Sequence, residues 1–442
     1  MEKIINVIGA GLAGCEAAWQ IAKRGIKVRL YEMKPVKYSP AHCTDGLAEL
    51  VCSNSFKAKN IDNGSGLLKE EMRRMCSLIL EAADVSEVPA GGALAVDRNV
   101  FSEYITRTLS ENPNIEIIRE EVRKLSELPA ADAIIIATGP LTSDALAEEI
   151  SKISGLDSLS FYDAAAPVVM VDSIDKSRVF RAARYGKGSA DYINCPMTKE
   201  EYLAFYDALI HAETADVEGF DDLKLYEGCM PVESMAKRGV DTLRFGPLKP
   251  VGLELPEGGT AYAVVQLRQD NTEGTLYNLV GFQTRLKFGE QKRVFGMIPG
   301  LENAEYARYG VMHRNTYIKA PGLLDATYKV IDSKTPLFFA GQITGVEGYI
   351  ESSSSGLVAG INAAKVVNGE PPVIFPQSTM TGALAHYASG YSGKDYQPMG
   401  ANFGIVSSDA PELKKKVRDK SMRKMIAAQR ALEIIKDISE KC

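Results

Sequence analysis

Three glycines near the N-terminus have a spacing that suits the binding of a dinucleotide. Gly9, Gly11 and Gly14 follow the apolar run at residues 4–8, and Glu32 ends the next apolar run. Gly9 permits a tight turn, Gly11 lets the backbone approach a pyrophosphate, and Gly14 lets a helix pack closely on a strand. The pyrophosphate then lies at the positive end of the helix dipole, and Glu32 can accept a hydrogen bond from a ribose 2′-hydroxyl. Strand, glycine turn, helix and acid together predict a dinucleotide site rather than an incidental glycine turn.

Two later apolar segments end in small residues. One ends in Ala-Thr-Gly at Gly139; the other ends in Ala-Gly at Gly341 and precedes Gln342 and a helix predicted to begin near Ser355. The glycine fingerprint and these two segment ends give three nucleotide signals. Their order along the chain resembles that in the FAD proteins of the glutathione-reductase-like superfamily. The resemblance implies an α/β fold with a glutathione-reductase-like FAD-binding domain. Gln342 departs from the superfamily, which usually has Asp at this position, but an amide can still bond phosphate or ribitol groups.

The long interval between Gly139 and Gly341 indicates a domain inserted into the FAD-binding domain. The expected boundaries are 1–164 for the first part of the FAD-binding domain, 165–310 for an inserted α+β domain on the RNA and folate side, 311–372 for the second part of the FAD-binding domain, and 373–442 for a C-terminal segment with a basic helix. The insert is mixed, because residues 199–213 have helical spacing whereas residues 261–267 and 277–282 resemble strands joined by a hairpin. The sequence has no second glycine fingerprint and therefore predicts no dedicated NAD(P)H-binding domain. NAD(P)H would then bind next to the flavin only transiently.

Composition favours a globular protein without a metal site. Of the 442 residues, 45% are hydrophobic and 24% charged, and no apolar run approaches the roughly 20 residues that span a bilayer. The first residues lack the basic and apolar regions of a signal peptide. The seven cysteines contain no CxxC pair and the four histidines are scattered, which indicates free thiols in a reducing compartment. We therefore expect a cytoplasmic protein with no membrane partner and no metal.

A basic stretch near the C-terminus contrasts with the formal net charge of −6. Lysines and arginines are dense between Lys414 and Arg430, and Lys416, Lys420 and Lys424 share one face of a helix. The pattern predicts an amphipathic helix whose basic face is either solvated or in contact with RNA phosphates. Composition alone leaves both interpretations open.

Six short motifs carry a more specific resemblance. They occupy residues 50–55 (LVCSNS), 227–231 (EGCMP), 242–250 (TLRFGPLKP), 309–316 (YGVMHRNT), 341–349 (GQITGVEGY) and 397–404 (QPMGANFG). Together they resemble the folate- and FAD-dependent tRNA (uracil-5-)-methyltransferase family over nearly the whole chain. The region around the fifth motif also resembles larger FAD proteins that install carboxymethylaminomethyl groups on wobble uridines. Those proteins are longer at the C-terminus, so chain length and the two cysteine motifs favour the shorter family.

The resemblance implies an enzyme that methylates C5 of a uridine in the tRNA T-loop. In that family 5,10-methylenetetrahydrofolate donates the one-carbon unit, FAD is both carrier and reductant, and NAD(P)H recharges the flavin. Uracil C5 is a poor nucleophile until a thiolate adds to C6, so the reaction needs a reactive cysteine. Two rival functions keep the same motifs: the same chemistry on a ribosomal RNA uridine, and an FAD-containing subunit of an RNA-modification assembly without turnover of its own.

The resemblance assigns the catalytic roles to two cysteines. Cys52 and Cys229 match the family's functional cysteines, whereas the other five match none. Cys229 is the preferred nucleophile toward C6, because its motif is rich in turn residues and because Lys237 and Arg238 would favour the thiolate. Cys52 is then assigned to the one-carbon unit or to the C5 proton. The reverse assignment of the two roles stays open.

The expected cofactor contacts come from the three nucleotide signals and from the loop after the last one. They are Gly9, Gly11, Gly14, Glu32, Gly139, Gly341, Gln342 and Tyr349. Tyr349 could stack on the isoalloxazine or on a base. His313, Arg314 and Asn315 could hold the pterin or the folate glutamate, or could simply form a packed loop.

Overall fold

The computed structural model describes residues 2–154, 159–164, 166–186, 189–215, 230–310, 312–392, 396–407 and 417–442. At residues 159–164 and 312–316 the description covers the backbone alone. Cys229, Lys414 and Lys416 therefore lie outside the described residues. Within the described ranges, no helix is both long enough and apolar enough to cross a membrane.

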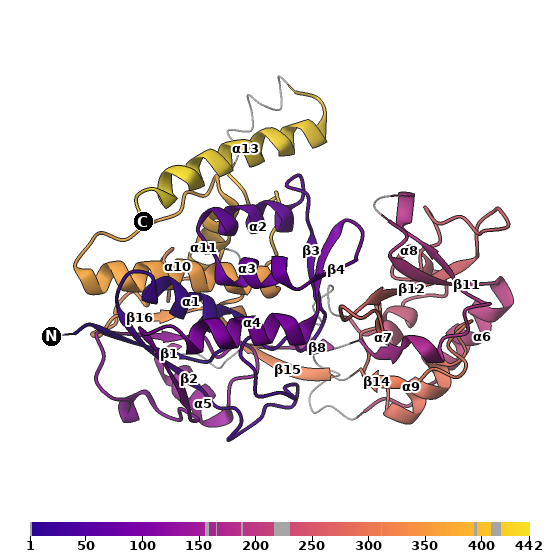
Figure 1. The fold of residues 1–442 in the computed structure, drawn as a ribbon, viewed down its shortest axis with the longest axis horizontal. Coiled ribbons are helices and arrows are strands. Elements are labelled where there is room, and N and C mark those ends of the chain that lie inside the picture. The colour runs from indigo at the N-terminus through magenta and orange to yellow at the C-terminus, as the bar shows by residue number, and fades with distance from the viewer. Residues whose placement is uncertain are drawn as a thin grey trace.

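A five-stranded parallel sheet forms the centre of the larger part of the molecule (Figure 1). Its strands, in spatial order, are β16 (Leu337–Phe339), β7 (Ala133–Ile136), β1 (Ile4–Ile8), β2 (Lys27–Glu32) and β6 (Ile115–Arg119). The central strand β1 is apolar and almost fully buried, as expected for a parallel strand covered on both faces. Parallel strands end at the same edge of a sheet, so Gly9, Glu32 and Gly341 meet there. This sheet confirms the predicted α/β fold class.

Two helices pack tightly against each other beside this sheet. They are α1 (Leu12–Ala22), which follows the glycine turn, and α10 (Tyr349–Asn368). A Cβ on Gly356 would lie 2.2 Å from the Ala13 carbonyl oxygen, and a Cβ on Gly360 would lie 2.7 Å from that of Ala17. Glycine is therefore needed at both positions. The helix predicted near Ser355 begins earlier, at Tyr349, because Gly348 supplies the turn that precedes it.

The remaining elements of this part surround the sheet and share one continuous core with it. The helices are α2 (Gly64–Arg74), α3 (Leu78–Val85), α4 (Arg98–Ser110), α5 (Asp144–Ser154), α11 (Met380–Gly390) and α13 (Lys420–Ser439), and a small sheet contains β3 (Ser55–Ala58), β5 (Ala93–Val96) and β4 (Glu87–Val88). The C-terminal helix α13 lies across α2 (Figure 1). Its buried residues Ala428, Ala431, Leu432 and Ile435 fall on one face and join the main core. The opposite side of α13 is left for solvent or a partner.

The second part of the molecule contains an antiparallel sheet with its own core (Figure 1). Its order is β10 (Phe180–Ala182), β11 (Tyr192–Met197), β12 (Ala263–Gln269), β13 (Leu276–Leu279), β9 (Val168–Met170) and β14 (Tyr306–Arg308). The sheet is accompanied by α6 (Lys199–Ile210), α7 (Val232–Ala236), α8 (Thr242–Phe245) and α9 (Phe288–Phe295). The helix predicted from residue 199 is α6, and Thr198 and Glu201 form a capping box at its start. Strands β12 and β13 with the turn between them form the predicted hairpin.

A two-stranded sheet lies between the two parts (Figure 1). β8 (Leu159–Ala164) pairs antiparallel with β15 (Met312–Tyr317), so the chain leaves and re-enters the flavin-type domain along adjacent strands. Both termini lie at the end of the molecule away from the antiparallel sheet (Figure 1).

Candidate active site

A cavity, here called the main cavity because the glycine fingerprint lines it, lies at the carboxyl ends of the parallel strands. Its lining includes Gly9, Gly11, Glu32, Gly139, Gly341, Gln342 and Tyr349. Of the eight residues expected to contact the cofactor, only Gly14 is absent from this lining. Segments that are far apart in the sequence therefore meet around one cavity, as the order of the three nucleotide signals predicts.

The three glycines of the fingerprint differ in what surrounds them. Gly9 has a φ of +95°, and a Cβ there would lie 2.7 Å from the Ala137 carbonyl oxygen. A Cβ on Gly14 would lie 1.8 Å from the Gly9 carbonyl oxygen, so Gly14 is required where helix and strand pack. A Cβ on Gly11 would meet no protein atom within 4 Å. A side chain at Gly11 would instead enter the cavity.

Glu32 lies buried at the end of β2, where two backbone N–H groups orient its carboxylate. One oxygen accepts the N–H of Ala10 at 3.1 Å, and the other accepts the N–H of Lys34 at 3.0 Å. A carboxylate has additional lone pairs beyond these two bonds. The side chain is therefore fixed at the cavity wall with acceptor capacity for a ribose hydroxyl.

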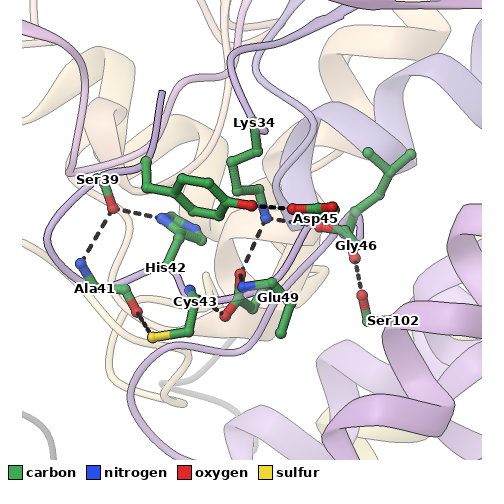
Figure 2. Close-up of polar contacts among 12 residues, drawn as sticks. Lys34, Ser39, Ala41, His42, Cys43, Asp45, Gly46, Glu49 and Ser102 are labelled. Carbon is green, nitrogen blue, oxygen red and sulfur yellow. Dashed lines mark hydrogen bonds and ion pairs between the residues drawn. The ribbon is translucent and has the colours of Figure 1, made fainter. Parts of the chain in front are cut away.

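A polar loop that the sequence did not predict follows Glu32. The Lys34 ammonium donates to Glu49 at 3.1 Å and to the Gly46 carbonyl at 2.7 Å, and Figure 2 shows these groups converging. The Glu49 carboxylate also accepts the N–H of Cys43 at 2.9 Å. Burial and the nearby Lys34 charge lower the pKa of His42, whose Nδ1 lies 2.6 Å from the Ser39 hydroxyl. Lys34, His42 and Glu49 all line the cavity, and only their position just after the fingerprint could have suggested it.

At another part of the cavity wall, Tyr349 contacts the loop at residues 50–54, here called the Cys52 loop. Its hydroxyl accepts the N–H of Cys52 at 2.7 Å and that of Ser53 at 3.2 Å, and its ring is tilted against Phe56 with centroids 5.7 Å apart. The sequence suggests that Tyr349 stacks on the isoalloxazine or on a base, and it gives no signal for this anchoring role. Gln342 donates to Glu347 at 2.8 Å, so this amide is also committed to the protein.

Two arginines converge on the backbone of the same loop. Arg98, at the start of α4, donates to the carbonyls of Leu50 at 2.5 Å and Cys52 at 3.3 Å. Arg308, on β14 of the other part of the molecule, donates to the Cys52 carbonyl at 3.2 Å. Arg98 also forms two bonds with Asp270, at 3.0 and 3.2 Å. The Cys52 loop is thus held from both parts of the molecule.

These charges interact with the Cys52 side chain. Burial opposes the charge of Arg98, but Asp270, Tyr349 and Cys52 together raise its pKa above the ordinary value. Burial and the neighbouring Arg98 lower the pKa of Arg308, while Asp270, Tyr349 and Cys52 oppose this change. Both guanidinium groups therefore lie close enough to Cys52 to interact with a charge on its sulfur.

A third arginine completes the contact between the Cys52 loop and the antiparallel sheet. Arg268, on β12, donates to Asn54 Oδ1 at 3.1 Å and to the Ser53 hydroxyl at 2.8 Å. The Asn54 amide donates in turn to the carbonyl of Gln269 at 3.0 Å. The sequence does not predict that Arg98, Arg268, Asp270 or Arg308 belongs to the site. No local signal identifies them, because their partners lie far away in the sequence.

Other predicted residues are placed differently or not described. Cys229 is outside the described residues, and His313 to Asn315 are described only as backbone on β15. Burial raises the pKa of the thiols of Cys15 and Cys195, so neither is suited to form a thiolate. Among the residues that the structure describes, no group of three or more His, Cys, Asp or Glu side chains could hold a metal ion.

Comparison with known proteins gives consistent matches. The family model described as "Glucose inhibited division protein A" matches residues 4–371. The chain is 61% identical over 443 residues to the methylenetetrahydrofolate–tRNA-(uracil-5-)-methyltransferase TrmFO of Acetivibrio thermocellus, covering 100% of both chains. It is 58% identical over 447 residues to the protein of that name from Lactococcus lactis, covering 99% of this chain and 98% of the relative. The structure of Aquifex aeolicus GidA superposes with a TM-score of 0.72 at 17% identity, over 100% of this chain and 73% of that one, which is a likeness of fold alone.

Proposed function

The chain belongs to the family of methylenetetrahydrofolate–tRNA-(uracil-5-)-methyltransferases, and from this premise we propose that it methylates C5 of a uridine in the T-loop of tRNA. The observation that carries the proposal is 61% identity over the full length of a relative with that name. The one-carbon donor is 5,10-methylenetetrahydrofolate. Because the reaction brings together tRNA, a reduced folate and NAD(P)H, we place it in the cytoplasm.

The main cavity suits FAD as the resident cofactor. Gly9 and Gly11 would lie against the pyrophosphate at the start of α1, where a Cβ on Gly11 would occupy ligand space. Glu32 would accept from the ribose hydroxyl, and Gln342 and Tyr349 would lie toward the isoalloxazine. When bound, FAD would supply the hydride that reduces the one-carbon unit to a methyl group, after its own reduction by NAD(P)H.

The protein must first make uracil C5 nucleophilic. We assign this step to Cys229, whose thiolate adds to C6 so that a sulfur–carbon bond forms and the C5–C6 π electrons move toward O4. C5 then bonds to the one-carbon unit as the π electrons of the C–N bond to its carrier return to nitrogen, and loss of the C5 proton expels that nitrogen to leave an exocyclic methylene on the uracil. Addition of the hydride to this methylene and departure of the thiolate from C6 restore the C5–C6 double bond and leave a methyl group on C5. Support for Cys229 comes from the family motif and from Lys237 and Arg238, which follow it closely in the sequence.

Cys52 is the residue that we assign to the C5 proton. It lies on the loop that Tyr349 anchors beside the cavity, and Arg98 and Arg308 both donate to its carbonyl. Because the thiolate is the form of cysteine that accepts a proton, the two guanidinium groups that hold this loop support the assignment. Tyr349, Arg98 and Arg308 are positioning residues in this scheme.

The test is a methylation assay with defined RNA. The purified protein is incubated with FAD, methylenetetrahydrofolate and either NADH or NADPH, and an unmodified tRNA transcript is then digested for nucleoside mass spectrometry. We expect 5-methyluridine in the T-loop fragment, and none in a matched transcript whose T-loop uridine is replaced by cytidine. Methylation confined to ribosomal RNA, or no methylation of any RNA by a flavin-loaded protein, would refute the proposal.

A further inference from the structure

A second cavity lies between α13, the first turn of α2 and residues 401–406. It has a volume of about 590 Å³. Its lining includes four cationic side chains and no Asp or Glu within the part of the chain that the structure describes. The cations are Lys57 from β3 and Lys420, Arg423 and Lys424 from α13. A hollow with this charge is suited to an anion.

Within the part of the chain that the structure describes, no acid forms an ion pair with the three α13 cations that line this cavity. Neither Lys420 nor Lys424 forms an ion pair with any described residue, and the Arg423 guanidinium donates to the carbonyls of Val417 and Arg418. The nearest acid on the helix, Asp419, accepts the N–H groups at the start of α13. The Lys424 ammonium lies 5.6 Å from the centre of the Phe403 ring, which is also part of the lining. The cavity thus combines positive charge with an aromatic face.

The start of α2 adds to this positive field. Asn63 precedes the helix without a side-chain capping bond, and Gly64 and Ser65 line the cavity. The N–H groups of a first helical turn lack partners within the helix and carry its positive dipole end. A Cβ on Gly64 would lie 2.3 Å from the Ala401 carbonyl oxygen, so glycine permits this close wall. The candidate anion site therefore consists of the cavity and its four cations, and the N-terminal end of α2 adds to the positive potential there.

Short contacts connect this cavity to the proposed active site. The Lys57 ammonium donates to Glu351 at 2.8 Å and to the Glu347 carbonyl at 3.4 Å. Glu347 accepts from Gln342, which lines the main cavity, at 2.8 Å. The Glu347 N–H donates to the carbonyl of Met399, just before the segment that lines the second cavity. Hydrogen bonds through Glu347 therefore connect the Lys57 side of this cavity to Gln342 in the lining of the main cavity.

We propose that this cavity binds a backbone phosphate of the RNA close to the uridine that is methylated. The inference rests on the proposed function and specifies how the RNA is held. A phosphodiester fits because it is a permanent anion and has lone pairs for both ammonium and N–H donors, while a ribose or base beside it can contact Phe403. Because Lys57 is connected through Glu347 to the lining of the main cavity, one bound phosphate would fix the register of the RNA relative to Cys52.

The test compares two double variants in the C-terminal segment. Lys420→Gln with Lys424→Gln removes two charges from the cavity, whereas Lys436→Gln with Lys441→Gln removes two charges from exposed positions outside it. Binding of a T-arm stem–loop RNA is measured by fluorescence anisotropy between 50 and 300 mM KCl, and turnover is measured with NADPH in excess. Bound flavin and thermal unfolding are recorded to verify that both variants fold.

The cavity variant should bind the RNA roughly tenfold more weakly, with a log–log salt slope smaller by about 1 to 2, because each phosphate contact contributes about 0.9. Its KM for RNA should rise while its KM for NADPH stays unchanged, and the control variant should match the wild type.

Unchanged RNA affinity and slope in the cavity variant would overturn the proposal even if the wild type methylates tRNA. A raised KM for NADPH with normal RNA binding would also overturn it, because the cavity would then hold a phosphate of the dinucleotide. Failure of the wild type to methylate tRNA would refute the proposed function instead, and the binding data would still decide the cavity's role.

Discussion

The hydroxyl of Tyr349 accepts the backbone N–H of Cys52 at 2.7 Å, joining the start of α10 to a loop 297 residues earlier in the chain. The same oxygen accepts the N–H of Ser53 at 3.2 Å. Because α10 packs on α1, a single hydroxyl couples the position of the Cys52 loop to the helix that follows the glycine turn. The geometry of the proposed catalytic thiol therefore depends on the nucleotide-binding frame.

Tyr349→Phe should slow methylation without removing the flavin. The substitution keeps the ring against Phe56 but leaves two N–H groups of the Cys52 loop without this acceptor, at a cost of about 1–3 kcal/mol. We expect kcat to fall roughly 10- to 100-fold, because small misplacements of a reacting group have effects of this size. Tyr387→Phe is the matched control, since its hydroxyl donates to Gln397 instead. The single-turnover methylation rate of each variant is compared with that of the wild type. A wild-type rate in Tyr349→Phe would exclude the anchoring role.

Gly11→Val should produce a folded protein without flavin. A side chain at Gly11 meets no protein atom and enters the cavity, so the clash falls on the cofactor rather than on the fold. We expect FAD affinity to fall by roughly 100-fold or more, since each 1.4 kcal/mol is tenfold in affinity. Gly289→Val, at an open and exposed position, should stay yellow. Absorbance at 450 nm and circular dichroism separate loss of flavin from loss of fold. A Gly11→Val protein with full flavin content would contradict the assignment of this cavity.

The two cysteine variants should fail at different steps. Cys229→Ala should keep bound FAD and NAD(P)H oxidation, yet lose methyl transfer and the covalent trap with 5-fluorouridine-substituted tRNA. Cys52→Ala should lose turnover while the adduct through Cys229 still forms. Denaturing gels show whether the covalent adduct between protein and RNA forms in each variant. An adduct that survives Cys229→Ala and disappears in Cys52→Ala would show that the two roles are reversed.

Asp270→Asn should impair catalysis from the other part of the molecule. Asp270 binds the Arg98 guanidinium through two bonds, and its loss leaves a largely buried arginine without its counter-charge. Arg98 would then shift from the carbonyls of Leu50 and Cys52, and we expect a loss of about 100-fold in kcat. Glu273→Gln, on the same turn but exposed, should behave like the wild type. If Asp270→Asn retains wild-type kcat, the Arg98–Asp270 pair has no positioning role.

The stability of the protein should depend on Lys69 above neutral pH. Burial lowers the pKa of this lysine from 10.5 to about 7, partly opposed by Glu351, and its amine donates to the Phe56 carbonyl at 2.6 Å. Between pH 7 and 10.5 the unfolded chain binds this proton and the folded chain does not, so stability rises with pH by about 1.4 kcal/mol per unit. Below pH 7 both states are protonated and this contribution is flat.

Lys69→Met removes this titration. Urea unfolding from pH 7 to 9.5 should show a difference in unfolding free energy between wild type and variant that grows with pH. Lys124→Met, at an exposed position, should show a constant difference. A constant difference for Lys69→Met as well would mean that the buried amine stays charged in the folded protein.

The sequence by itself determined the features that depend on neighbouring residues. The fingerprint at Gly9, Gly11 and Gly14, the small residues at Gly139 and Gly341 and the helical spacing from Lys199 are all local patterns, and backbone sterics translate them into turns, strands and helices. The order of the three nucleotide signals then indicated one cavity. The family motifs indicated Cys52 and Cys229 as the reactive residues.

Tertiary structure alone decided which distant residues surround Cys52. Asp270 is 172 residues from Arg98, Arg308 comes from the antiparallel sheet, and Tyr349 lies on a helix that begins earlier than the pattern around Ser355 indicated. Lys57 likewise meets Lys420 and Lys424 only because α13 lies across α2. Periodicity and capping report on contacts within a few residues, whereas these pairs are set by the packing of two sheets and their helices. Buried polar groups must find partners wherever the fold brings them, and a single sequence does not encode that pairing locally.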